Sequence, residues 1–153
     1  MSEAESLTEI TIEYEGVPID PARVEQVVRA TFESEGAMAF PVSIAFVDDQ
    51  TIEKVNVEFL EHEGPTDVIT FDLGGHPTAP GDVGGELVIS PEYALGLAGE
   101  ERAADETLLY VCHGILHLLG HDDHEDEEAR AMHERALAIL APLGIHPAGY
   151  REV

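Results

Sequence analysis

The sequence predicts one α+β domain with a mostly mixed, four-stranded β-sheet and four to five helices. The length of 153 residues suits a single domain. Segments whose apolar residues repeat every two positions alternate with segments of helical period, which indicates strands and helices in turn. Two strand-like segments then follow each other directly before two helical segments. We therefore expect one domain over residues 1–153, in the order β-α-β-α-β-β-α-α.

The first half of the chain alternates strands and helices. Residues 7–16 carry apolar side chains at every second position, which predicts a strand. Asp20 is typical of a helix N-cap, and Pro21 is typical of a first helical residue. The expected inward-facing residues are Ile10, Ile12 and Tyr14 in the first strand, Val24, Val27, Val28 and Phe32 in the first helix before Gly36, Val42, Ile44 and Phe46 in the second strand, and Ile52, Val55 and Phe59 in a second helix capped by Asp48 or Asp49.

The second half predicts two buried strands and two helices. Residues 66–73 and 85–90 are short and rich in β-branched residues, which indicates buried strands, with a Gly/Pro-rich loop between them. Residues 105–120 are apolar on nearly every side and predict a helix in the core, ended by Gly120. The last helix begins near Glu125, and its expected inward-facing residues are Ala129, Met132, Ala136, Leu137 and Leu140, with Pro142 and Gly144 ending it.

Acidic residues dominate the composition. The chain has 32 Asp and Glu against 7 Lys and Arg, which gives a net charge of −25. This balance argues against non-specific attraction to nucleic-acid phosphates. Because the acids are spread along the chain, we interpret them as a solvated surface, suited to a halophilic organism with a high-salt cytoplasm. The sequence has no long apolar run, no signal-peptide pattern and one cysteine, Cys112, so we expect a cytoplasmic protein with no disulfide and no membrane partner.

Residues 113–124 (HGILHLLGHDDH) combine four histidines and two aspartates. His113 and His117 are four residues apart on the predicted buried helix, so their side chains leave one face, one turn apart. Gly120 allows the chain to turn back, and a residue about three positions later can meet the same ion. That residue is Asp123 or His124. Three protein ligands leave a position for water, which is typical of a catalytic zinc site.

Zinc peptidases commonly carry the helical motif H-E-x-x-H, in which the glutamate is the general base. Here Gly114 follows His113. This difference weighs against a metalloprotease of that type. Zinc can lower the pKa of a bound water to about 7 and can polarise a phosphoryl or carbonyl oxygen.

The segment HGILHLLGHDDH resembles the H-G-x-L-H-L-x-G-[YH]-D-H signature of the YbeY family of bacterial rRNA maturation factors. GPTDVITFDL, GELVIS and VNVEFL are similar to further motifs of that family, and the resemblance covers about residues 40–145. It implies a metal-dependent endoribonuclease domain with a zincin-like metal-binding helix. In the family the first two histidines bind zinc, which implies one zinc ion held by His113 and His117.

Two positions depart from the family pattern. The third ligand, usually histidine, falls on Asp123, while His124 comes one residue late. We prefer Asp123 because it keeps the spacing from Gly120, and His124 is the alternative. His121 takes the place of a Tyr or His and is expected to be a packing or loop residue. A carboxylate ligand would leave the bound water less acidic than a third imidazole would.

The second departure is Leu60, where the family generally carries an arginine. Leucine cannot bind a phosphate in a bidentate manner. His62 lies close by in sequence and is a candidate for the rim of the metal cleft, as are Thr66, Asp67 and Ser90, although capping and turn roles account for the last three equally well. Three other histidines receive no role from the sequence, namely His76, His133 and His146.

The function implied by the resemblance is single-strand-specific, zinc-dependent endoribonuclease activity in 16S rRNA 3′-end maturation and ribosome quality control. The expected partners are the 16S rRNA precursor, the small ribosomal subunit and its assembly proteins, without DNA or a membrane. One alternative is a non-catalytic ribosome assembly factor with a structural zinc ion. A metalloprotease is the less favoured alternative.

Overall fold

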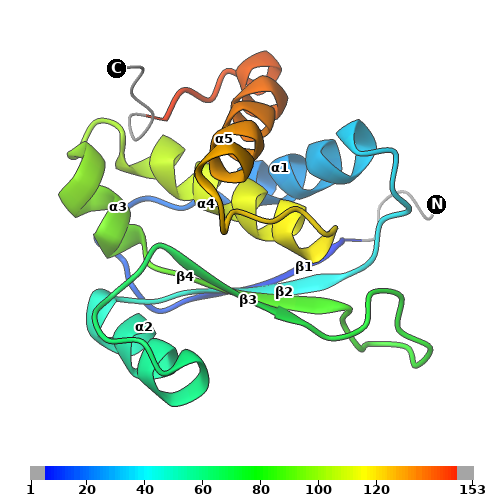
Figure 1. The fold of residues 1–153 in the computed structure, drawn as a ribbon, viewed down its shortest axis with the longest axis horizontal. Coiled ribbons are helices and arrows are strands. Elements are labelled where there is room, and N and C mark those ends of the chain that lie inside the picture. Colours follow the sequence, from blue (N-terminus) through cyan, green and yellow to red (C-terminus); the bar gives the residue numbers. More distant parts are fainter. Residues whose placement is uncertain (1–5, 148–153) are drawn as a thin grey trace.

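The computed structural model describes residues 6–147 and places four strands in one mixed sheet, as expected (Figure 1). The strands are β1 (Thr8–Ile12), β2 (Val42–Phe46), β3 (Val68–Asp72) and β4 (Gly85–Ile89). Their order in the sheet is β1-β2-β4-β3, with β1, β2 and β4 parallel and β3 antiparallel to β4. The strand β3 therefore forms one edge of the sheet.

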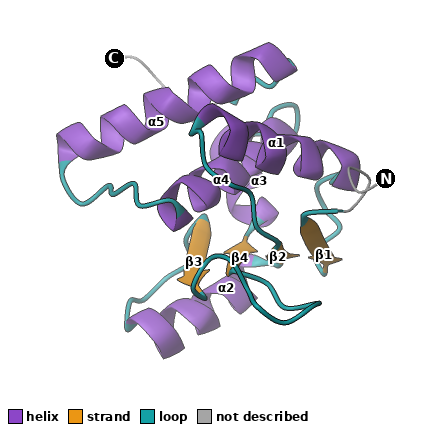
Figure 2. Cartoon of the chain, turned by 90° about the vertical axis from the view of Figure 1, so that its right-hand side faces the viewer, coloured by secondary structure: helices purple, strands orange, loops and turns teal. Residues whose placement is uncertain are grey.

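The described residues contain five α-helices, in agreement with the expected number. They are α1 (Pro21–Ser34), α2 (Asp49–Val55), α3 (Pro91–Ala98), α4 (Ala103–Leu118) and α5 (Asp126–Leu140), with a π-helix η2 (Asn56–Leu60) and a 3-10 helix η3 (Ala141–Leu143). The helices α1, α4 and α5 cover one face of the sheet, whereas α2 lies on the other (Figure 2). The two histidines of α4, His113 and His117, thus lie on a helix between the sheet and the outer helix α5.

The helix α3 corrects the expected element order, which passed directly from the last strand to the buried helix. The Ser90 hydroxyl accepts a hydrogen bond from the backbone N–H of Tyr93 at 3.1 Å, and Pro91 is the first helical residue. These are ordinary start signals for a helix. The segment was missed because its eight residues are mostly apolar and lack a clear polar face.

The second expected helix ends earlier than predicted. The Asp48 carboxylate caps α2 as expected, accepting from the N–H of Thr51 at 2.8 Å, but the helix changes to the π-helix after Val55. The wider turn displaces Phe59 from the apolar stripe, and its side chain is 59% exposed. Its ring packs edge-on against Phe71 with centroids 5.5 Å apart. Phe59 is therefore a surface residue and not the core residue that its spacing predicted.

The helix α4 is buried along most of its length, as the sequence predicted. Cys112 on this helix is fully buried and accepts a hydrogen bond from the Thr31 hydroxyl at 3.4 Å. Burial raises the pKa of the Cys112 thiol to about 12. Cys112 is thus a core residue, on a different face of the helix from the histidines.

The first and last helices follow their predicted patterns closely. The Asp20 carboxylate caps α1 by accepting from the N–H of Ala22 at 3.0 Å, and the predicted apolar stripe is buried. In α5, Met132, Ala136 and Leu140 are buried as expected, together with Ile139, whereas Ala129 and Leu137 are half-buried.

The described residues form a single domain. Among residues 6–147, no helix combines the length and the hydropathy needed to cross a membrane. The expected domain range of 1–153 also included residues 1–5 and 148–153, which lie outside the described residues.

Candidate metal centre

His113 lies in the middle of α4, and its imidazole is turned into the protein. The Nε2 atom is inaccessible to solvent and has no hydrogen-bond partner among residues 6–147. Burial, followed by the neighbouring charges of His133 and His117, lowers the pKa of His113 to about 3. A buried polar atom without a partner is costly. This neutral nitrogen has the chemistry of a zinc donor.

His117 lies one helical turn after His113 and is oriented by the loop that follows α4. Its Nδ1 atom is 3.3 Å from the backbone carbonyl oxygen of His121, and its Nε2 atom is 3.5 Å from Oδ2 of Asp123. When Nδ1 donates to that carbonyl, the lone pair is on Nε2, an arrangement common among metal-binding histidines. The backbone therefore fixes one ring nitrogen and leaves the other facing the loop.

Gly120 reverses the chain after α4, as its position predicted. Its φ of +101° lies in the left-handed region. The N–H of His121 then donates to the carbonyl oxygen of Leu116 at 3.0 Å, which closes the helix end. The chain turns back and brings Asp123 beside His117.

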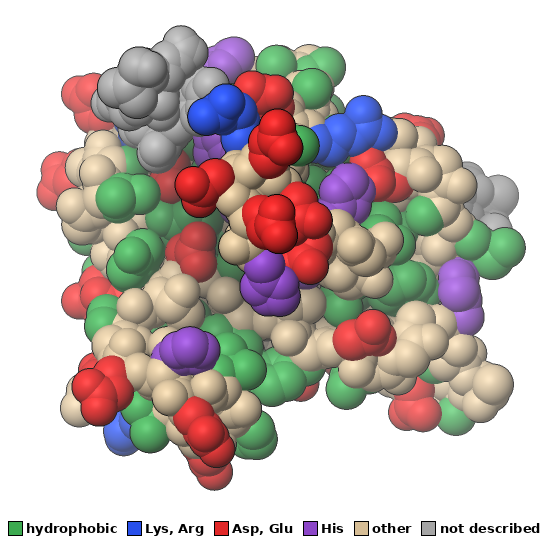
Figure 3. Space-filling model, in the orientation of Figure 1, with side chains coloured by type: hydrophobic (Ala, Val, Ile, Leu, Met, Phe, Trp, Pro, Cys, Tyr) green, Lys and Arg blue, Asp and Glu red, His purple; other side chains and the backbone are tan. Residues whose placement is uncertain are grey.

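Asp123 and His124, the two candidates for the third ligand, are placed differently. Asp123 is 49% exposed and faces His117. The His124 side chain is 82% exposed, and its Nδ1 atom is 2.8 Å from Oδ1 of Asp122. Acidic and histidine side chains gather on the face shown in Figure 3, where α4 ends and α5 begins. Of the two candidates, the fold therefore brings Asp123, and not His124, beside His117.

His121 is held by residues from other helices. Its Nε2 atom is 2.6 Å from Oε1 of Glu35, and the other oxygen of Glu35 accepts from Nε of Arg135 at 2.6 Å. Burial alone would raise the pKa of Glu35, but the hydrogen bonds from His121 and Arg135 outweigh it and the pKa is lowered. His121 thus joins the end of α1 to this loop, which agrees with the expected packing role.

Thr66 and Asp67 precede β3 at the edge of the sheet. Asp67 accepts hydrogen bonds from the N–H of Val68 at 2.7 Å and from the Thr66 hydroxyl at 3.2 Å. Burial raises the pKa of Asp67 despite these bonds, and the nearby charge of Asp123 raises it further. The start of β3 and the loop after α4 therefore each carry a carboxylate, and the charge of Asp123 acts on Asp67.

Ser90 and His62, the other rim candidates, have different surroundings. The Ser90 hydroxyl is fully buried and donates to Oδ1 of Asp49 at 2.7 Å while capping α3. The His62 side chain is exposed, and its backbone N–H donates to the carbonyl oxygen of Asn56 at 3.3 Å. Within residues 6–147, no hydrogen bond or ion pair joins either side chain to the α4 histidines.

His133 lies beside His113, although the sequence assigned it no role. It lies on α5, and its ring centroid is 5.5 Å from that of His113. No spacing along the chain links these two residues, because only the packing of α5 against α4 brings them together. A histidine flanking the buried Met132 on the last helix was the single available signal, and it was too weak to assign a role.

Gly114 explains why α4 carries no glutamate after its first histidine. The residue is buried, and a Cβ atom at this position would lie 2.7 Å from both Cδ atoms of Leu87 on β4. The helix therefore packs closely on the sheet at this point. A glutamate after His113 would therefore require the Leu87 side chain to move.

The donors around α4 do not meet at a single point. Within residues 6–147, no three His, Cys, Asp or Glu side chains are grouped so that they could hold a metal ion as they stand. The buried Nε2 of His113 and the pair formed by His117 and Asp123 nevertheless supply nitrogen and oxygen donors of the kind that zinc prefers. The donor atoms are of the kind that zinc binds, but in this arrangement they do not form a complete site.

The comparison with protein families identifies the chain. The family model described as "Endoribonuclease YbeY" matches residues 9–144. The chain belongs to the YbeY family. The match covers every strand but the first residue of β1, and it includes the HGILHLLGHDDH segment that begins on α4.

Curated YbeY relatives are similar over most of this chain. "Endoribonuclease YbeY" of Carboxydothermus hydrogenoformans is 39% identical over 144 residues, covering 91% of this chain and 99% of the relative. That of Rhodopirellula baltica is 40% identical over 133 residues, covering 83% and 67% respectively. The solution structure of TM1509 from Thermotoga maritima shares the fold, with a TM-score of 0.56 and 24% identity over 95% of this chain and 97% of that one.

Proposed function

We propose that this YbeY family member is a zinc-dependent endoribonuclease that cleaves single-stranded RNA in the cytoplasm. Its proposed role is 16S rRNA 3′-end maturation and ribosome quality control, with the small ribosomal subunit and its assembly proteins as partners. The observation that carries the proposal is the placement of His113 and His117, one turn apart on α4, in a chain that matches an endoribonuclease family.

The proposed ligands of one zinc ion are His113 and His117, with Asp123 as the preferred third group. Asp123 is favoured over His124 because it faces His117, whereas His124 is paired with Asp122 in solvent. Bound zinc would supply a Lewis acid that polarises a phosphoryl oxygen and acidifies a water molecule. The carbonyl of His121 would keep the ring of His117 in the orientation needed for binding.

The negative charge of the chain favours contacts with the nucleotide bases of RNA over contacts with its phosphates. Only 7 Lys and Arg residues are available against 32 acids, so phosphate contacts would be few. The exposed side chains of Phe59 and Leu60 offer an apolar surface instead. Stacking of a base on an aromatic side chain contributes about 1–3 kcal/mol and requires an unpaired base. This supports a preference for single-stranded RNA.

The test is cleavage of single-stranded and duplex RNA by highly purified protein, with and without a metal chelator. His117→Ala is the test variant and His146→Ala is its control, because His146 is an exposed residue on the segment after η3. We expect loss of cleavage of at least about 100-fold for His117→Ala and for chelated wild type, and none for the control. Equal cleavage by His117→Ala would contradict the proposal and would favour the non-catalytic assembly factor.

A further inference from the structure

The π-helix η2 presents the ring of Phe59 to solvent beside the edge strand of the sheet. The side chain is 59% exposed, and its ring centroid lies 5.5 Å from that of Phe71 on β3, with the two planes inclined by 82°. A pair of this geometry holds both rings in position without stacking them face to face. Phe59 therefore has ring surface on which another planar group can stack.

The backbone around Phe59 is held in an unusual conformation. Glu61 follows η2 with a φ of +59°, in the left-handed region that glutamate seldom adopts. The buried Asn56 holds this turn, because its side-chain N–H donates to the carbonyl oxygen of Gly64 at 3.0 Å and its own carbonyl oxygen accepts from the N–H of His62 at 3.3 Å. Short π-helices and strained residues are frequent at functional sites. Local strain thus accompanies the exposure of this aromatic ring.

The segment around Phe59 carries acids and no cation that could bind a phosphate. No Lys or Arg occurs in the sequence between Lys54 and Arg102. Three exposed glutamates lie in the segment, namely Glu58, Glu61 and Glu63. Affinity for phosphates comes from Lys and Arg. RNA at this surface is therefore bound through a neutral, planar group, which is the nucleobase.

The edge strand β3 lies between this surface and the helix that carries the histidines. Phe59 contacts Phe71 on β3 from the side of α2, whereas α4 packs against β3 from the other face of the sheet (Figure 2). Because β3 is an edge strand, its outer side is not covered by a further strand of the sheet. An RNA strand that passes this edge can contact both faces.

We propose that Phe59 is a base-stacking residue that gives the protein a preference for a purine at one position of its RNA substrate. The inference rests on the proposed function and deepens it, since cleavage of single-stranded RNA leaves the identity of the bases open. In proteins that bind single strands without reading base edges, the strength of stacking sets modest sequence preferences. A purine has two fused rings and therefore overlaps more of an aromatic side chain than a pyrimidine does.

The first test uses tryptophan as a reporter, because the chain contains none. Phe59→Trp keeps an aromatic ring at the subsite. Met38→Trp is the control, because Met38 is an exposed apolar residue in the segment that joins α1 to β2, on the side of the molecule opposite α2 (Figure 1). Short 2′-O-methyl oligoadenylate and oligouridylate are titrated with a chelator present, so that cleavage does not interfere.

We expect saturable quenching of the tryptophan in Phe59→Trp, with binding at least about 3-fold tighter for oligoadenylate than for oligouridylate, and no saturable quenching in Met38→Trp. Equal affinity for the two oligonucleotides, equal quenching at the two positions, or no saturable quenching in Phe59→Trp would overturn the proposal. The last result would leave the surface to a different partner, such as a basic protein segment.

A second measurement separates stacking from apolar contact. Phe59→Leu keeps an apolar side chain but removes the flat ring, whereas Phe59→Tyr keeps the ring. By calorimetry, the affinity for oligoadenylate should fall at least about 5-fold in Phe59→Leu and stay within about 2-fold of wild type in Phe59→Tyr. The far-ultraviolet circular dichroism of both variants should be unaltered, because the side chain is exposed. Wild-type affinity in Phe59→Leu would contradict stacking.

The salt dependence identifies the kind of contact. Phosphate contacts weaken steeply with salt, because binding releases counterions. At this acidic surface, salt instead screens the repulsion between the glutamates and the phosphates, so the affinity for oligoadenylate should stay constant or rise between about 0.1 and about 1 M KCl. A fall of more than about 10-fold would show that phosphate contacts dominate and would overturn the proposal.

The outcomes distinguish this inference from the proposed function. Oligonucleotide binding that needs Phe59, together with no RNA cleavage by wild type, supports the subsite and contradicts the nuclease. RNA cleavage that needs His117, with no preference for purines in wild type or in Phe59→Leu, supports the nuclease and contradicts the subsite.

Discussion

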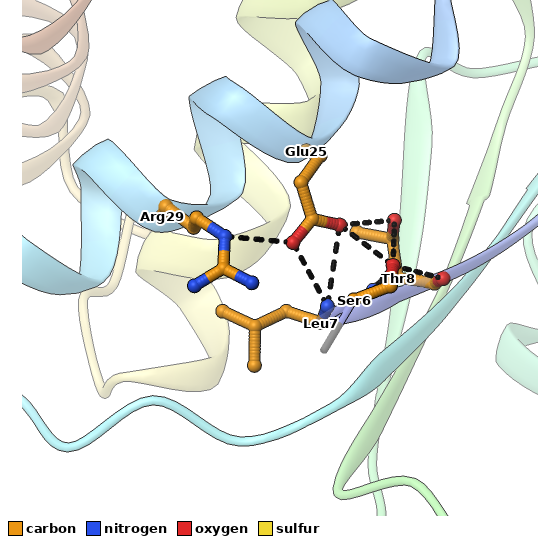
Figure 4. Close-up of polar contacts among 5 residues, drawn as sticks. All are labelled: Ser6, Leu7, Thr8, Glu25 and Arg29. Atoms are coloured by element: carbon orange, nitrogen blue, oxygen red, sulfur yellow. Dashed lines mark hydrogen bonds and ion pairs between the residues drawn. The ribbon is translucent and has the colours of Figure 1, made fainter. Parts of the chain in front are cut away.

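Glu25 on α1 and His113 on α4 both carry polar atoms that the fold removes from solvent at least in part. Glu25 has hydrogen-bond partners in the described part of the chain, whereas Nε2 of His113 has none there. Oxygens of Glu25 accept from the N–H of Leu7 at 2.9 Å, the Thr8 hydroxyl at 2.7 Å and Nε of Arg29 at 2.8 Å (Figure 4). The Nε2 atom of His113 has no partner among residues 6–147. A polar cluster completed by its own chain is structural, whereas a buried polar atom without a partner in the chain calls for one from outside it, such as a water molecule or an ion.

The largest expected effect is on the histidine side of this comparison. Zinc should stabilise the wild type because it binds the folded chain and completes the cluster around His113. At a free zinc concentration 1,000 times the dissociation constant, the free energy of unfolding should rise by about 4 kcal/mol. Urea unfolding with and without zinc measures the rise, which His113→Leu should abolish. An equal rise in His113→Leu would place the ion elsewhere.

The next largest expected effect is the loss of stability when the Glu25 carboxylate is removed. Glu25→Ala leaves the N–H of Leu7 and the hydroxyl of Thr8 without the Glu25 acceptor, so the free energy of unfolding should fall by about 1–3 kcal/mol. Zinc affinity should not change. The control is Glu33→Ala, which removes an exposed glutamate from the same helix. A loss no larger than that of Glu33→Ala would show that the Glu25 cluster contributes nothing.

A smaller effect of opposite sign is expected for His113→Leu without metal. Leucine removes a buried nitrogen that has no partner while it fills a similar space. The metal-free variant should therefore be more stable than metal-free wild type by about 1 kcal/mol. Urea unfolding in the presence of a chelator measures the difference. A clear loss of stability would show that His113 is satisfied by the protein itself.

The smallest expected effect is a change with pH in the stability that Glu25 contributes. Burial alone would raise the pKa of Glu25, but hydrogen bonds from Leu7, Thr8 and Ser6 and the charge of Arg29 outweigh it, and the pKa lies below its ordinary value of 4.5. A lowered pKa stabilises the fold above 4.5, and this contribution is lost as the pH falls through the lowered value. The stability difference between wild type and Glu25→Gln should therefore be constant at neutral pH and shrink below pH 4.5. A difference that grows in acid would contradict this account.

Much of this fold could be predicted from local sequence signals. Asp20 and Pro21 mark the start of α1, and Gly120 marks the end of α4. Each of these residues acts on the backbone within a few positions of itself, so its effect can be predicted from the local sequence. The helix α3 was missed because it is short and mostly apolar. The exposure of Phe59 could not be predicted, since the change from an α-helix to a π-helix has no simple spacing rule.

The candidate site also contains residues that the local sequence indicates and one residue that only tertiary packing brings near them. His113, His117 and Asp123 lie within one continuous segment, so their spacing and Gly120 could indicate them together. His133 comes from α5, and only the packing of one helix on another brings its ring to 5.5 Å from that of His113. Contacts of this kind depend on the assembled tertiary structure and leave no period in the sequence.

The most direct test of the incomplete cluster is a zinc-bound structure of the full chain. The account predicts one ion about 2.0–2.1 Å from nitrogen atoms of both His113 and His117, on the face of α4 that Asp123 covers. An ion bound instead by Asp122 and His124 in solvent, with Nε2 of His113 still without a partner, would contradict it.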